Sequence, residues 1–230
     1  MAIRFGRKTA QNWKEQIIVN ERLKKDFAKN QGTIMFPSSH DIHPDVLNES
    51  ICFLNRILSK GNRVLIVTKP HLECVKEICN RFDYHKNKIM FRFTIGSVDS
   101  KVLKFWEPGA PDFEERYKSL IYAYHHGFQT SVSCEPMLDD KVIELVKKLS
   151  PYVSDYLWIG KANYLLRRLK INNADDDTTK KRANELIQFQ TDEKIKVLYK
   201  KLHKNPKLKW KESIKKVVGI ELVRQKGMDV

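Results

Sequence analysis

The feature that most constrains the fold is an alternation of short apolar runs and amphipathic helical segments along the chain. Strand-like runs rich in β-branched and aromatic residues are predicted at 33–36, 63–68, 89–97, 129–136 and 155–160. Each is followed by helical spacing, at 44–60, 71–82, 112–126, 139–149 and 162–170. This alternation predicts βαβ units and hence an α/β fold with a parallel sheet. Because five strands are too few to close a barrel, the sheet is either open or missing a strand.

Three segments are expected. Residues 1–31 are a basic helical N-terminal segment, residues 32–170 hold the βα units, and residues 171–230 form a basic helical extension. A tail of about 60 residues forms only a marginal core by itself, so the extension is expected to pack on the sheet.

The net charge of +15 is concentrated at the two ends of the chain. Residues 1–31 carry 8 Lys/Arg and 3 Asp/Glu, and residues 171–230 carry 15 Lys/Arg and 9 Asp/Glu. A basic coat at both ends suits a polyanionic partner, DNA or RNA first. The alternative is a lysine-rich surface that is merely solvated.

Targeting signals and cysteine chemistry are both inconspicuous in this sequence. No apolar run approaches the ~20 residues of a membrane span, and the N-terminus lacks the apolar core of a signal peptide. A cytoplasmic protein with no membrane partner is therefore expected. The four cysteines, Cys52, Cys74, Cys79 and Cys134, have neither disulfide-framework nor metal-site spacing. Cys52, Cys74 and Cys79 are expected to be small buried apolar side chains.

Small polar and charged residues stand where the predicted strands end, which is where parallel α/β proteins hold their ligands. Hydroxyls, lysines, acids, an amide and glycines together suit a zwitterionic, hydroxyl-bearing ligand. The candidate binding residues are Ser38, Ser39, His40, Asp41, Lys69, Thr94, Ser97, Glu135, Gly160 and Asn163. No glycine-rich phosphate loop occurs. No catalytic residue is assigned.

The first strand end admits other interpretations. His43, followed by Pro44, is a better helix cap than Asp41. His40, Asp41 and His43 also resemble the metal ligands of barrel hydrolases, although no second such cluster recurs at later strand ends. A metal-dependent hydrolase is therefore a lesser alternative.

A proline-rich loop, Glu107-Pro-Gly-Ala-Pro111, follows the third strand and is predicted to form a wall or lid over that strand end. Arg116, in the next helix, is a candidate partner for Glu107 or for Asp41; otherwise it is a solvated helix charge.

The order of these motifs resembles the radical S-adenosylmethionine enzymes, in the branch that contains the spore photoproduct lyases. The resemblance covers about residues 1–170 and is carried by T-K-P at 68–70, F-R-F-T-I-G-S at 91–97, W-E-P-G-A-P-x-F-E-E-R at 106–116, S-x-E-P at 133–136 and W-I-G-K-x-N at 158–163. It implies a six-stranded (βα)6 partial TIM barrel, here lacking its first strand, with additional C-terminal helices.

The resemblance also implies a cofactor and a chemistry. S-adenosylmethionine at the strand ends would be cleaved reductively by a [4Fe-4S] cluster for radical chemistry, with DNA-repair-like action on nucleic acid as one outcome. Ser38, Ser39, His40 and Asp41 would then face the methionine amino group, and Lys69 the carboxylate. Thr94 and Ser97 would face the ribose or carboxylate, while Glu135 and residues 158–163, with Gly160 and Asn163, would border the adenosine.

The sequence departs from this family in one respect. The C-x3-C-x2-C loop that holds the cluster is absent, and the family pattern places it just ahead of a segment like Ile3–Lys8. The expectation is a truncated family member whose cluster ligands lie outside these residues. The hydrogen-donor cysteine of the lyases is absent too, so thymine-dimer repair itself is not expected. A non-catalytic basic nucleic-acid-binding protein on a degenerate barrel is the main alternative.

Overall fold

The structure is a computed structural model that describes residues 18, 19, 21, 23, 27–38 and 40–222. The predicted helical segment at 1–31 therefore lies largely outside the described residues, as does Ser39.

Six parallel strands form one sheet in which the spatial order equals the chain order. Each strand pairs in parallel with the next along the chain, so all six point the same way. The strands are β1 (Thr33–Phe36), β2 (Arg63–Thr68), β3 (Ile89–Thr94), β4 (Gln129–Cys134), β5 (Leu157–Ile159) and β6 (Leu208–Trp210). This order is consistent with a partial α/β barrel.

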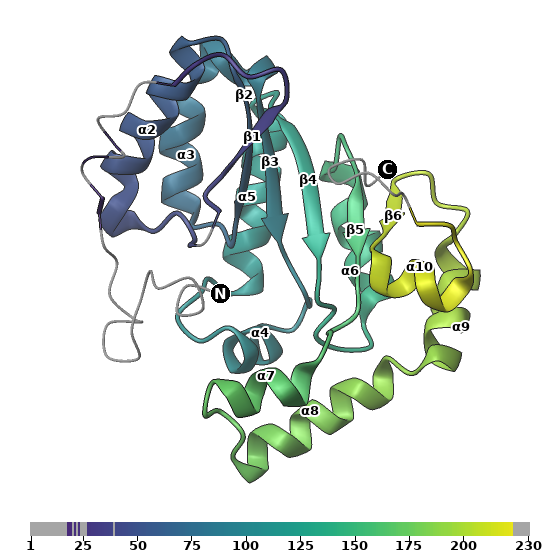
Figure 1. Ribbon diagram of the computed structural model, residues 1–230. Coiled ribbons are helices and arrows are strands. Elements are labelled where there is room, and N and C mark those ends of the chain that lie inside the picture. The colour runs from purple at the N-terminus through teal and green to yellow at the C-terminus, as the bar shows by residue number, and fades with distance from the viewer. Residues whose placement is uncertain (1–17, 20, 22, 24–26, 39, 223–230) are drawn as a thin grey trace.

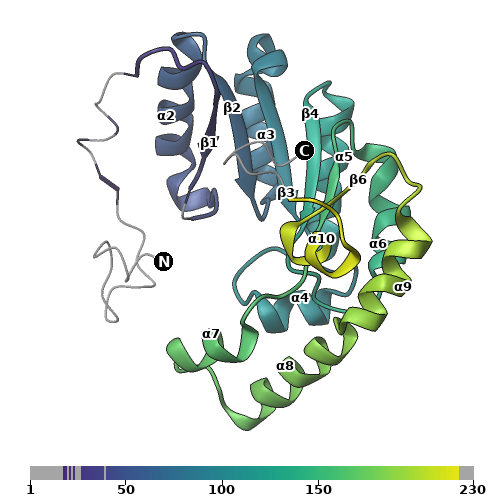
Figure 2. The ribbon, with the colours of Figure 1, turned by 45° about the vertical axis from the view of Figure 1, so that its right-hand side comes forward.

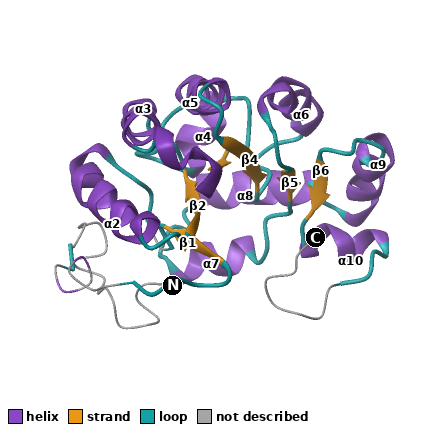
Figure 3. Cartoon of the chain, turned by 90° about the horizontal axis from the view of Figure 1, so that it is seen from above, coloured by secondary structure: helices purple, strands orange, loops and turns teal. Residues whose placement is uncertain are grey.

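Helices cover the convex side of this curved sheet. Seen from above, α2, α3, α5, α6 and α9 form an outer arc around the strands, while α10 lies inside the arc beside β6 (Figure 3). The α-helices are α2 (Leu47–Ser59), α3 (Leu72–Arg81), α4 (Ser100–Trp106), α5 (Phe113–His125), α6 (Val142–Leu149), α7 (Leu165–Ile171), α8 (Asp177–Phe189), α9 (Asp192–Leu202) and α10 (Glu212–Val218). Three 3-10 helices complete the set: η1 (Pro44–Val46), η2 (Asp83–Lys88) and η3 (Ser150–Tyr152).

The core lies between the sheet and the outer arc. In β3, the alternate residues Ile89, Phe91 and Phe93 are at most 1% exposed and pack in this core. Met90 and Arg92 alternate with them and are only half-buried, so they line the concave side. The period of two along a strand thus gives the sheet one dry face and one face open to ligands.

The C-terminal extension contributes a strand as well as helices. The sequence predicted helical structure near Trp210, but Leu208–Trp210 is β6, which pairs with β5. Backbone bonds at both ends hold it there, from Leu157 N to Lys207 O (2.8 Å) and from Lys211 N to Ile159 O (2.8 Å). A three-residue strand between lysines carries too little pattern to be recognised alone, and its tertiary partner decides its conformation.

Other elements match the sequence prediction within a few residues. The predicted strand at 89–97 ends at Thr94, and the loop that follows contains the unpredicted helix α4. The strand at 129–136 ends at Cys134, because residues 135–138 turn across the strand ends. Within the residues that the structure describes, no helix combines the length and apolar character needed to cross a membrane.

The turn after β4 is fitted between two glycines on the neighbouring strand ends. Met137 N donates to Gly160 O and Leu138 N donates to Gly96 O, each at 2.9 Å. A Cβ on Gly96 would lie 2.8 Å from both the Pro136 carbonyl oxygen and the Leu138 side chain. Glycine is required at position 96 because the turn passes directly over it.

We therefore expect Gly96→Ala to lower the free energy of unfolding by about 1–3 kcal/mol, the usual cost of forcing an extra methyl into a packed site. Urea denaturation measures the change. Gly32→Ala is the matched control, since a Cβ there meets nothing within 4 Å. Equal stability of the two variants would show that the turn over Gly96 yields without cost.

Candidate functional site

The carboxyl ends of all six strands meet at one edge of the sheet. The arrowheads of β3 and β4 point toward this edge, where α4, α7 and α8 also lie (Figures 1 and 2). Predicted site residues from β1 to β5 are brought to this one edge by the parallel order. The residues differ, however, in whether their polar groups are free to meet a ligand.

An ion pair joins the ends of β1 and β2. Asp41 Oδ2 lies 3.1 Å from Lys69 Nζ, while Asp41 Oδ1 accepts from Lys69 N at 2.8 Å and from Thr68 Oγ1 at 3.3 Å. Thr68 Oγ1 in turn accepts from Ile42 N at 3.1 Å. The pair is held rigidly by the backbone, yet the side chains of Lys69 and Asp41 remain 27% and 38% exposed. A fixed carboxylate and a fixed ammonium are therefore both presented to solvent.

The other predicted residues of this strand end are also accessible. Ser38 and His40 are exposed, and the His40 ring meets Phe36 edge-on at a centroid distance of 6.1 Å. The predicted cap is confirmed, because His43 Nδ1 accepts from Asp45 N at 3.3 Å and Pro44 lies in the first turn of η1.

Two imidazoles that the sequence analysis did not pair stand beside this ion pair. The rings of His43 and His71 meet edge-on with centroids 4.9 Å apart. His71 Nδ1 is 3.6 Å from Glu115 Oε1, and the same oxygen accepts from Leu72 N at 3.0 Å. Burial lowers the pKa of His71 below 6.5, and the Glu115 carboxylate offsets part of this effect. His71 immediately follows the T-K-P motif, but only the packing of α3 on α5 shows its partner.

The proline-rich loop is fixed by a buried arginine. Arg116 is fully buried; its Nη1 lies 2.6 Å from Glu107 Oε2 and 3.1 Å from Thr94 O, and its Nε donates to Pro111 O at 2.7 Å. Of the two partners predicted for Arg116, Glu107 is the one found. Loop 107–111 is thereby clamped to the end of β3. Removing either charge would leave the other buried without its counter-charge, which is costly.

The hydroxyl of Ser97 is already engaged. Ser97 is fully buried, donates to Asp139 Oδ2 and accepts from Asp99 N at 2.8 Å. Burial raises the pKa of Asp139 above its usual value. Ser97 therefore positions Asp139, a carboxylate that the sequence analysis did not single out, while Thr94 is half-buried at the end of β3.

Glu135 and Gly160 belong to a second ion-paired group, at the ends of β4, β5 and β6. Glu135 Oε2 is 3.4 Å from Lys211 Nζ, and this ammonium lies 4.9 Å from the centre of the Trp158 ring. A Cβ on Gly160 would lie 2.9 Å from Glu135 Cγ and 3.0 Å from Lys211 Cβ. The space over Gly160 is thus filled by the protein's own side chains, whereas a ligand ring was predicted there. Lys211 was missed because it belongs to the extension.

The C-terminal extension packs against this second half of the edge. Gln190, at the end of α8, is 5% exposed; its Oε1 accepts from Ala162 N at 2.6 Å and its Nε2 donates to Met137 O at 2.8 Å. Lys161 pairs with Asp192 at 2.9 Å. Asn163 is exposed on the way into α7. The side chains of Lys211 and Glu135 nevertheless remain 22% and 35% exposed, so the extension supplies one member of a second partly exposed ion pair rather than burying this half of the site.

Two buried side-chain nitrogens of the described residues have no hydrogen-bond partner, namely Arg116 Nη2 and Trp158 Nε1. Arg116 donates to the carbonyl oxygen of Thr94 at the end of β3. Trp158 lies on the concave face of β5, and the Arg92 guanidinium is 5.2 Å from the centre of its ring. Unsatisfied buried donors cost about 1–3 kcal/mol each, so both mark places where an acceptor would be stabilising.

The cysteines do not form a site for an iron–sulfur cluster. Cys74 and Cys79 are buried in α3, and burial raises the pKa of each thiol to about 12. Cys134 is fully buried in β4 with its pKa raised by the same cause. The expectation that Cys52 is buried is wrong, because this residue lies on the exposed side of α2. Cluster ligands must be thiolates that converge, but the three buried thiols disfavour the thiolate form and the four cysteines do not converge. Among the described residues, no group of three or more His, Cys, Asp or Glu side chains could hold a metal ion.

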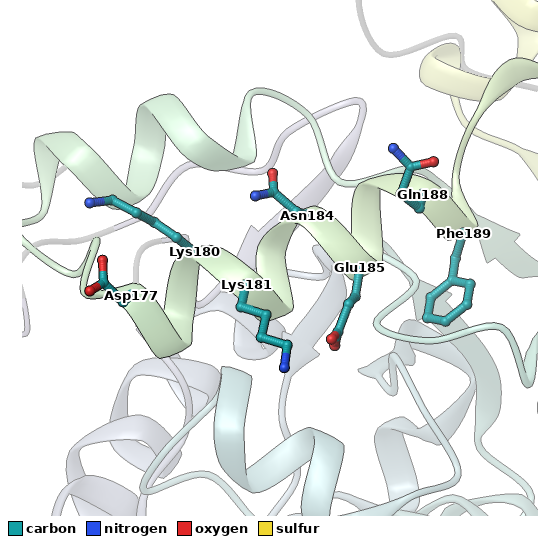
Figure 4. A pocket seen from close by; sticks show the side chains of 7 residues that line it. All are labelled: Asp177, Lys180, Lys181, Asn184, Glu185, Gln188 and Phe189. Carbon is teal, nitrogen blue, oxygen red and sulfur yellow. The ribbon is translucent and has the colours of Figure 1, made fainter.

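A cavity of about 640 Å³ lies along α8, as Figure 4 shows. All of its lining residues come from this one helix, and their charges are mixed: Asp177, Lys180, Lys181, Asn184, Glu185, Gln188 and Phe189. A depression along a single helix, with acids and lysines at helical spacing, is typical of a solvated surface.

Comparisons of the chain with family models, with curated proteins and with solved structures found no significant match. The functional argument therefore rests on the residues and the geometry above.

The pKa of His71 makes stability depend on pH. The pKa of this histidine is lower in the folded protein than in the unfolded chain. Its contribution to the unfolding free energy is therefore fully present above pH 6.5 and is lost as the pH falls from 6.5 toward the folded-state pKa. We expect His71→Gln to flatten the dependence of the unfolding free energy on pH between about 7 and 5.

Urea denaturation at several pH values measures this effect. His125→Gln, at an exposed position of α5, is the control and should retain the wild-type slope. Identical slopes in both variants would show that His71 does not favour the neutral form in the folded protein.

Proposed function

We propose that this chain is a spore photoproduct lyase-like member of the radical S-adenosylmethionine superfamily, and that it binds S-adenosylmethionine at the β1–β3 strand ends. The observation that carries the proposal is the Asp41–Lys69 pair, a carboxylate and an ammonium held 3.1 Å apart and both partly exposed. An α-amino acid presents the complementary pair of charges, so Asp41 can accept from its ammonium while Lys69 binds its carboxylate.

The neighbouring groups fit the rest of such a ligand. Ser38 and His40 supply exposed polar groups next to Asp41, and Thr94 supplies a half-buried hydroxyl at the end of β3. Loop 107–111, clamped through Arg116, gives this part of the site a rigid wall. Such pre-organisation favours binding because little side-chain freedom is lost when the ligand arrives.

The cluster that the superfamily uses does not fit the residues of this chain. Its four cysteines neither converge nor favour the thiolate form at the three buried positions. In the proposed function these residues therefore bind and orient the sulfonium amino acid, and its reductive cleavage is assigned to no residue described here.

Lys69→Met should weaken S-adenosylmethionine binding by about 10- to 100-fold, the equivalent of one hydrogen bond to a charged group. Asp41→Asn should weaken it comparably, since the amide keeps the Oδ1 acceptor for Thr68 and Lys69 N but loses the charge. Isothermal titration calorimetry on the whole chain measures both.

Lys86→Met is the matched control, because the Lys86–Asp83 pair has the same 3.1 Å separation and lies in η2, away from the strand ends. The control should bind like the wild type. Absence of binding by the wild-type chain, or equal affinity of Lys69→Met and Lys86→Met, would contradict the proposal.

A basic nucleic-acid-binding surface is the second candidate function, and α9 is the observation that favours it. Lys194, Lys196, Lys200 and Lys201 are all exposed on this helix, and neither Lys200 nor Lys201 has an ion pair within the described part of the chain. Lys207, by contrast, donates to Ser150 O and Val153 O, so it serves the fold. Exposed lysines without an ion pair among the described residues suit a phosphate backbone.

The double substitution Lys200→Glu with Lys201→Glu should weaken the binding of a single-stranded oligonucleotide. It should also reduce the slope of the logarithm of the binding constant against the logarithm of the salt concentration by about 1–2. Fluorescence anisotropy at several salt concentrations measures both quantities. Lys118→Glu with Lys147→Glu, exposed on α5 and α6, changes the net charge equally and is the control. The same loss in both double variants would mean that only net charge matters.

A further inference from the structure

The opposite edge of the sheet, where the strands begin, holds two adjoining cavities of about 390 and 320 Å³. They share four lining residues, Thr33, Arg63, Asn87 and Lys88, and we call them together the basic cleft. The strand starts face away from α7 and α8 (Figure 1), so the basic cleft is separate from the strand-end site. Its combined size is in the range of small-molecule sites.

The charge of the basic cleft is one-sided. Its described lining includes four cationic side chains, Lys29, Arg63, Lys88 and Arg92, and no Asp or Glu. Arg92 is partly neutralised by Asp155, at 3.5 Å. Arg63 and Lys88 have no ion pair among the described residues. Elsewhere on this protein lysines and arginines are often paired with acids, as in the Lys69 and Lys211 pairs.

The sheet itself brings two of these cations, Arg63 and Lys88, together. Arg63 is the first residue of β2 and lies opposite Thr33 in register. Lys88 immediately precedes β3, two residues before Met90, which pairs with Leu65 of β2. Arg63 and Lys88 therefore extend from neighbouring strands on the same concave side, and neighbouring strands are only about 4.8 Å apart. Two long side chains that start from adjacent strands can bring a guanidinium and an ammonium to adjacent phosphate groups.

The wall of the basic cleft is built before any ligand arrives. Asn62 is 1% exposed; its Oδ1 accepts from Asn30 N at 2.7 Å, and its Nδ2 donates to Ala28 O at 3.2 Å and to Ile57 O at 3.1 Å. This buried amide ties the segment that carries Lys29 to the turn that carries Arg63. Holding like charges beside one another costs energy unless an anion is present, so a pre-formed cationic wall is suited to one.

We propose that the basic cleft binds a ligand with two or more consecutive phosphate groups. Arg63 and Lys88 contact the phosphates, Lys29 and Arg92 flank them, and the amides of Asn87 and Gln129 offer further donors. Leu65 and Met90 form an apolar patch beside the cations. A free polyphosphate and a nucleoside triphosphate share this chemistry, and the apolar patch distinguishes them because only the nucleotide carries a base to cover it.

Arg63→Gln with Lys88→Gln removes the two cations that both cavities of the basic cleft share. Lys118→Gln with Lys147→Gln removes two exposed cations from α5 and α6 and is matched in charge. Circular dichroism and thermal melting check that both variants fold. Binding of inorganic triphosphate, of a nucleoside triphosphate and of a single-stranded oligonucleotide is then measured by calorimetry at fixed salt.

The expected result is saturable 1:1 binding of inorganic triphosphate, weakened at least tenfold in the Arg63/Lys88 variant and less than twofold in the Lys118/Lys147 variant. Tighter binding of the nucleoside triphosphate identifies a nucleotide as the source of the phosphates, and equal binding identifies a free polyphosphate. No saturable binding of either triphosphate, equal losses in both variants, or binding of the oligonucleotide alone would overturn the proposal.

Discussion

Parallel hydrogen bonding between successive strands is the constraint on which the whole structure depends. Because each strand pairs in parallel with the next along the chain, every strand start lies on one edge of the sheet and every strand end lies on the other. Each crossover must return through a helix on the convex side, which leaves the concave side open. The two edges can then carry different sets of charged side chains, and in this protein they do.

The two edges differ in how their charges are neutralised. At the strand ends, cations are paired with acids: Lys69 with Asp41, Arg116 with Glu107, and Lys211 with Glu135. Such pairs fix geometry and offer both signs of charge, which suits a zwitterion. At the strand starts, Arg63 and Lys88 stand together without a carboxylate in the cleft lining. That arrangement suits a ligand with negative charge alone, so the distribution of acids distinguishes the two edges.

The C-terminal extension takes part in one half of the strand-end edge. Gln190 and Lys161 fasten it over the ends of β4 and β5, and Lys211 fills the space over Gly160. A segment that composition marks only as a basic tail thus contributes Lys211 to the second ion pair of this edge, and the space over Gly160 is occupied by the protein itself.

The sequence by itself determined the parallel α/β class, five of the six strands, the strand-end positions of most of the polar residues and the capping role of His43. These follow from periodicity and from local chemistry, which act within a few residues. Only the tertiary structure decided that Leu208–Trp210 is a strand and that the Ser97 hydroxyl is hydrogen-bonded to Asp139. It also decided that Lys211 covers Gly160 and that Arg63 and Lys88 line the same cleft. Each of these depends on a partner far away in the chain, and which distant residues become neighbours is settled by the packing of the whole sheet.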